Sequence, residues 1–94
     1  MRNYEVMYIL RPELEDSAVT EMVEKFQNQV TEQGGTVADV DNWGKREFAY
    51  ELEGKREGTY VVMHFESTSA VAEELRRVMK LNEDVLRCLV LNRD

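Results

Sequence analysis

Residues 41–65 read DNWGKREFAYELEGKREGTYVVMHF, and this stretch decides the fold because it joins two alternating segments through a turn-forming sequence. The turn EGKREG at 53–58 leads into a returning strand at 59–66, which is the pattern of an antiparallel hairpin. A strand that covers a single core needs apolar side chains on one face only. Here apolar side chains occupy both faces. The sequence therefore predicts a second apolar surface, outside the core, whose function has to be explained.

Alternating side chains predict the other strands as well. The first strand of the hairpin is expected over 36–52, which is too long to stay flat unless Gly44 bends or bulges it. A strand at 3–10 is ended by Pro12, and a last strand is expected at 85–92. The predicted sheet therefore has four strands.

Apolar residues at helical spacing predict two amphipathic helices. The first covers 16–33, with Asp16 or Ser17 as its N-cap, and the second is capped by Thr68 or Ser69. The order β-α-β-β-α-β is that of an α+β, ferredoxin-like fold. Two right-handed crossovers place both helices on one face of an antiparallel sheet, so its other face is expected to be bare.

The pleat of the strands assigns each apolar side chain to one face of this sheet. Toward the helices we expect Tyr4, Val6, Tyr8, Leu10, Val61, Met63, Phe65, Leu86, Cys88 and Val90. On the bare face we expect a partner-binding set of Met7, Ile9, Phe48, Tyr50, Tyr60, Val62 and Leu89. Two alternatives stay open, because these side chains could fold over the sheet edge and a register shift of one residue would exchange the faces.

The formal net charge of −7 is distributed unevenly. Residues 11–41 carry 2 basic and 8 acidic side chains, whereas residues 42–94 carry 9 basic and 10 acidic ones. Such a chain can turn a basic side toward phosphate. The candidate RNA-binding residues are Arg2, Lys45, Arg46, Lys55, Arg56, Arg87 and Arg93. For Arg46 and Arg87 the alternative is cross-strand pairing with Glu47, Glu51 or Glu5.

Other classes of protein are disfavoured by the composition. Cys88 and His64 are each the only residue of their type, so neither a disulfide nor a zinc site is expected. No nucleophile-and-base, phosphate-loop or metal motif occurs, and we expect no enzyme, no cofactor and no catalytic residue. With no signal peptide and no apolar run of about 18 residues, the 94 residues are expected to form one domain in the cytoplasm.

Four blocks of the sequence resemble ribosomal protein six of the bacterial small subunit, in the expected order along the whole chain. They are RNYEVMYILRPEL (2–14), NWGKREFAYEL (42–52), REGTYVVMHFE (56–66) and LNEDVLRCLVL (81–91). The family's signature is matched at Gly44, Lys45, Arg46, Phe48, Ala49 and Tyr50, although the family more often has leucine in place of Phe48.

The resemblance implies a ferredoxin-like fold and two partners. Proteins of this family pair with a small, basic companion, ribosomal protein eighteen, and bind the central domain of small-subunit ribosomal RNA with it. Phe48 and Val62 match apolar positions that contact the companion, and Arg2, Arg46 and Arg87 match basic positions that face RNA. The alternative hypothesis is a self-associating, ferredoxin-like regulatory or small-ligand module.

Overall fold

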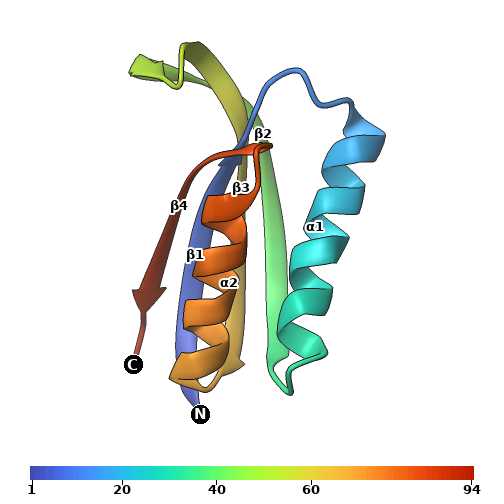
Figure 1. The fold of residues 1–94 in the computed structure, drawn as a ribbon, viewed down its shortest axis with the longest axis vertical. Helices are drawn as coiled ribbons and strands as arrows, with labels where there is room; N and C mark the ends of the chain where they lie inside the picture. Colours follow the sequence, from blue (N-terminus) through green and yellow to red (C-terminus); the bar gives the residue numbers. More distant parts are fainter.

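A computed structural model describes all residues 1–94 as one antiparallel sheet packed against two helices (Figure 1). The elements in chain order are β1 (Arg2–Leu10), α1 (Asp16–Thr31), β2 (Thr36–Leu52), β3 (Lys55–Ser67), α2 (Ser69–Leu81) and β4 (Val85–Asn92). The strands are arranged in the order β2-β3-β1-β4, so β2 and β4 form the edges. This confirms the predicted ferredoxin-like fold.

The turn between β2 and β3 is tighter than the sequence predicted. Leu52 pairs directly with Lys55, so only Glu53 and Gly54 form the turn, and both have positive φ angles of 51° and 76°. Two residues with positive φ are what a type I′ hairpin turn requires. The strand β3 therefore begins at Lys55 rather than at residue 59.

The expected irregularity at Gly44 is confirmed. Gly44 has a φ of 78°, and the register between β2 and β3 shifts between Asn42 and Gly44. The extra residue in this bulge is Trp43, which is left without a partner in the strand pairing. The bulge thereby turns a large aromatic side chain onto the sheet face away from the helices, where it stacks on Tyr60.

The core lies between the helices and the predicted inner face of the sheet. Tyr4 stacks on Phe65 with ring centroids 5.5 Å apart. The inward residues of β1 and β3 are confirmed as core members, and Cys88 and Val90 pack against them. The assignment of Leu86 is wrong, because a register shift between β1 and β4 makes Val85 the residue that packs against the core.

The two helices differ in how they begin. The predicted cap of α1 is wrong, because Glu15 is the N-cap and makes no side-chain hydrogen bond there. For α2 the prediction of Thr68 is confirmed, since its hydroxyl accepts from the backbone N–H of Val71 at 3.4 Å. Neither helix has the length and apolar character that crossing a membrane would require.

Tyr8 carries the one buried side-chain oxygen that lacks a hydrogen-bond partner. Its ring packs edge-on against Phe26 with centroids 5.1 Å apart, and burial raises the pKa of its hydroxyl. Removing an unpaired buried hydroxyl removes its desolvation cost, so Tyr8→Phe should raise the free energy of unfolding by about 1 kcal/mol. Urea denaturation measures this change.

Tyr4→Phe is the matched control on the same face of β1, because the hydroxyl of Tyr4 is not enclosed without a partner. Its free energy of unfolding should change by less than about 0.5 kcal/mol. If Tyr8→Phe instead destabilised the chain by more than Tyr4→Phe, the hydroxyl of Tyr8 would have a stabilising contact and the account of the core would be incorrect.

Candidate partner interface on the open sheet face

The sheet face opposite the helices, called the open face below, carries the predicted partner-binding residues, but it is not bare. Although Ile9 and Val62 lie on this face, they are only 2% and 6% exposed. The expectation that every residue of the set would be accessible is therefore wrong for these two. They form the floor of the surface, and other residues form its accessible part.

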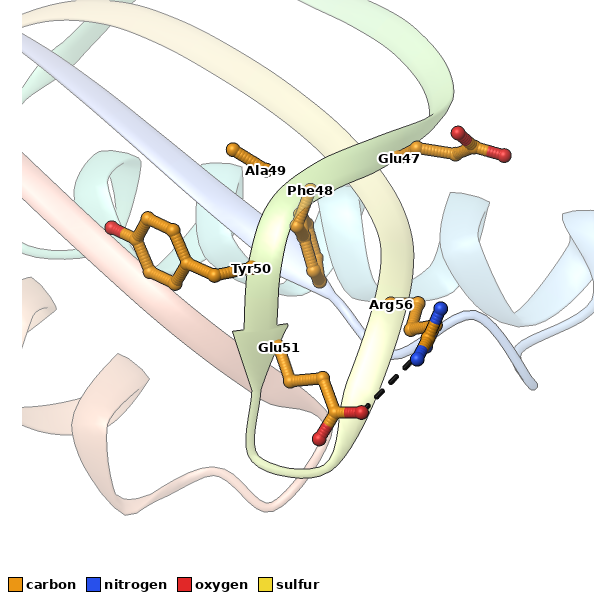
Figure 2. Close-up of a pocket in the computed structure, with 6 residues that line it drawn as sticks. All are labelled: Glu47, Phe48, Ala49, Tyr50, Glu51 and Arg56. Atoms are coloured by element: carbon orange, nitrogen blue, oxygen red, sulfur yellow. Dashed lines mark ion pairs between the residues drawn. The ribbon is translucent and has the colours of Figure 1, made fainter.

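Ile9 is covered because the end of the β2-β3 hairpin packs on it at Gly58. A Cβ atom on Gly58 would lie 2.6 Å from Ile9 Cγ2 and 3.0 Å from Phe48 Cζ, so only glycine allows this approach. The Phe48 ring also packs on Tyr60, with centroids 6.1 Å apart. In Figure 2 Phe48 lies over the space between the two hairpin strands, while Tyr50 extends away from them.

A shallow hollow of about 290 Å³ brings most of the predicted set together. We call it the aromatic hollow, and its apolar lining includes Met7, Ile9, Phe48, Tyr50, Tyr60 and Leu89. Tyr50 is 68% exposed and Leu89 is 47% exposed, so large apolar groups face solvent at its border. Arg87 also lines the hollow, which places a cation directly beside apolar surface.

A second hollow, of about 520 Å³, lies on the same face and shares Met7 with the first. We call it the acidic hollow. Val62 joins Met7 among its apolar residues, and Trp43 lines it as well. Its charged and titratable lining consists of Glu5, Asp39, Asp41 and His64. The apolar residues of the open face thus continue into a region with negative charge.

Trp43 is a residue of this surface that the sequence analysis missed. Its ring is stacked on Tyr60 at 6.3 Å with an interplanar angle of 8°, and its Nε1–H donates to Asp41 Oδ2 at 3.0 Å. The guanidinium of Arg46 lies 6.0 Å from the ring centroid. The signal that could have identified Trp43 was its position beside Gly44, where the long strand needed a bulge.

The predicted RNA-binding residues do not form one patch. Arg2 and Arg93 lie at the end of the sheet near the two chain termini, and the remaining candidates lie toward the hairpin end (Figure 1). Lys55 is paired with Glu13 at 2.5 Å, and Arg56 with Glu51 at 3.6 Å (Figure 2). The two basic residues of the hairpin tip are therefore both ion-paired within the chain. The alternative that Arg46 and Arg87 pair with Glu47, Glu51 or Glu5 is wrong, because neither arginine makes an ion pair and the guanidinium of Arg46 lies over the Trp43 ring.

His64 joins three strands across the open face. Its Nδ1 lies 2.7 Å from Asp39 Oδ1 on β2, and its Nε2 lies 2.9 Å from Glu5 Oε1 on β1. A neutral imidazole can donate only one hydrogen bond, whereas the protonated ring donates to both carboxylates. Both hydrogen bonds raise the pKa of His64 above 6.5, and the one to Asp39 has the larger effect.

A pH-dependent stability follows from this raised pKa. The stabilising effect of His64 is complete below the unfolded pKa of 6.5 and is lost as the pH rises through the higher pKa of the folded chain. The free energy of unfolding lost in His64→Gln should be larger at about pH 5.5 than at about pH 8.5. Because the side chain is 42% exposed, screening should keep the difference below about 1 kcal/mol.

Urea denaturation of both proteins at the two pH values measures this difference, and the comparison removes the contribution of the other titrating groups. An equal loss at both pH values would show that His64 does not hold its proton between Glu5 and Asp39.

Comparison with known proteins agrees with this architecture. A profile of the family described as Ribosomal protein S6 matches residues 3–92. The small ribosomal subunit protein bS6 of Moorella thermoacetica is 53% identical over 90 residues, which cover 96% of this chain and 92% of that protein. That of Desulforamulus reducens is 50% identical over 91 residues, covering 97% and 96%.

Solved structures show the same fold. The crystal structure of 30S ribosomal protein S6 from Thermotoga maritima superimposes with a TM-score of 0.93 at 28% identity, covering 98% of this chain and 87% of that one. The C-terminal domain of the MgtC protein from Mycobacterium tuberculosis, at 17% identity and a TM-score of 0.63, shares the fold alone. The relatives are named as ribosomal proteins, which confirms the prediction that the chain is not an enzyme. The chain belongs to the ribosomal protein S6 family.

Proposed function

We propose that this chain is a structural protein of the small ribosomal subunit in the cytoplasm. In this proposal residues 1–94 act as one domain and bind the central domain of the ribosomal RNA together with ribosomal protein eighteen. The relatives carry the name of a small-subunit protein. The observation that carries the proposal is the aromatic hollow, because it leaves large apolar side chains exposed on a face that the chain's own helices do not cover.

Charge supports a basic protein as the first partner. The chain has a net charge of −7, and acidic residues line the open face beside the apolar ones. A small basic protein is attracted to such a surface, and apolar contacts at the aromatic hollow then stabilise the complex. Tyr50 and Leu89 provide accessible apolar area, while Ile9 lines the same hollow as a buried residue.

Contact with RNA is proposed to depend on the basic side chains that the chain does not pair with its own carboxylates. Arg87 is exposed, makes no ion pair and lies beside the aromatic hollow, so it can reach phosphate next to a bound companion. Arg2, Lys45 and Arg93 are also exposed and unpaired. These few cations on an acidic chain imply weak binding to RNA in isolation and stronger binding once the companion adds its positive charge.

Phe48→Asp tests the docking surface. A carboxylate placed in a desolvated apolar patch should weaken binding of purified ribosomal protein eighteen by several kcal/mol, about 2 or more. Isothermal titration calorimetry measures the affinity. Phe48→Leu is the matched control, because it keeps an apolar side chain at this position and should bind within about 1 kcal/mol of the parent.

Because Phe48 also packs on Tyr60 within the chain, Leu89→Asp provides a second variant at a side chain that is 47% exposed. It should weaken binding while leaving the circular dichroism spectrum unchanged. Normal affinity for the companion in both Phe48→Asp and Leu89→Asp would show that docking uses a different surface.

The salt dependence of RNA binding tests the role of Arg87. The logarithm of the affinity of the two-protein complex for ribosomal RNA should fall linearly with the logarithm of salt concentration, and Arg87→Ala should reduce the slope by about 1. Filter binding over a salt series measures the slope. Lys25→Ala, which removes one exposed cation from α1, should leave it unchanged, and equal slopes for Arg87→Ala and the parent would remove Arg87 from the RNA contact.

A further inference from the structure

The acidic hollow is lined by several carboxylates, whereas the aromatic hollow is lined mainly by apolar side chains. Three carboxylates, from Glu5 on β1 and from Asp39 and Asp41 on β2, line the same depression as the apolar Met7 and Val62. Their side chains do not form a metal-binding group. Because Met7 borders both hollows, a molecule seated on the aromatic hollow would extend directly over the acidic one.

Electrostatics leave this hollow negative even after internal pairing. His64 holds two of the carboxylates through its ring nitrogens, and in its protonated form it supplies one positive charge against the three negative ones. The carboxylate of Asp41 is engaged only by the neutral Nε1–H of Trp43. Arg46 does not line the hollow, although its guanidinium lies 6.0 Å from the centroid of the Trp43 ring. An uncompensated negative charge therefore faces solvent beside apolar surface.

We infer that the acidic hollow receives a lysine or arginine side chain of the basic companion protein when that protein occupies the open face. This inference rests on the proposed function and names a specific contact within it. The aliphatic part of such a side chain would pack on Met7 and Val62, and its cationic end would reach Asp39 and Asp41. Trp43, which is 45% exposed, also lines the hollow and adds aromatic surface beside the bound side chain.

RNA is the other candidate occupant, since exposed aromatic rings on a sheet can stack with bases. The carboxylates argue against it, because a base that stacked on Trp43 would bring its phosphate close to Asp39, Asp41 and Glu5. Phosphate and carboxylate repel each other, and His64 is the one residue lining this hollow that can carry a positive charge. The charges thus favour a cationic side chain from a protein.

The test uses the double variant Asp39→Asn/Asp41→Asn, which removes two charges and keeps the size of both side chains. Its affinity for purified ribosomal protein eighteen should fall by at least about tenfold, since a cation would lose both of its carboxylate partners. The matched control is Glu21→Gln/Glu24→Gln on the exposed side of α1. This variant changes the net charge by the same amount, at positions outside the hollow. The affinity of this control should stay within about twofold of the parent.

The fluorescence of Trp43 reports occupancy directly, because it is the chain's only tryptophan. With the companion's own signal subtracted, saturating companion should change the Trp43 emission of the parent chain and of the α1 control. Unchanged emission of the parent chain at saturation, or parent-like affinity of the Asp39→Asn/Asp41→Asn variant, would overturn the inference.

The outcomes separate this inference from the proposed function. If Phe48→Asp abolishes companion binding while the Asp39→Asn/Asp41→Asn variant binds normally, the docking surface is correct and the inference about the acidic hollow is wrong. If the double variant gains affinity for ribosomal RNA and keeps its affinity for the companion, RNA occupies the hollow and the inference fails. If the parent chain does not bind the companion at all, both fail.

Discussion

The pleat of a sheet that is covered by helices on one face is the constraint on which the rest of this structure depends. Successive side chains of β1 and β3 point to opposite faces, so filling the core with Val6 and Val61 sends Met7 and Val62 to the other side. Two helices cover one face of a four-stranded sheet. The apolar side chains on the other face must therefore be covered by the chain's own hairpin or by another molecule.

The chain uses both solutions on the same face. The hairpin end covers Ile9 through the close approach of Phe48 at Gly58, which gives the open face a packed floor. Tyr50 and Leu89 stay accessible above that floor. A surface with buried supports and exposed anchors is preorganised for docking, because little side-chain entropy is lost when a partner binds. Negative charge beside it in the acidic hollow adds a preference for basic partners.

Periodicity predicted the elements and most of the core, because alternation and helical spacing are local properties of the sequence. The conformation of Gly44 was also predictable, since the length of β2 required a bulge there. The packing of Val85, rather than Leu86, against the core was not predictable. It follows from a register shift that only the pairing of β1 with β4 defines. Tertiary contacts likewise decided which parts of the candidate site are accessible. Contacts between different strands or loops cover Ile9, stack Trp43 on Tyr60 and pair Lys55 with Glu13.

Hydroxyl-radical footprinting of side chains, applied to the free chain and to assembled small ribosomal subunits, tests most directly whether the open face is the docking face. The side chains of Tyr50, Leu89 and Trp43 are accessible in the free chain and should become strongly protected in the subunit. Equal reactivity of these three residues in the two states would contradict the account, because the open face would then still face solvent after assembly.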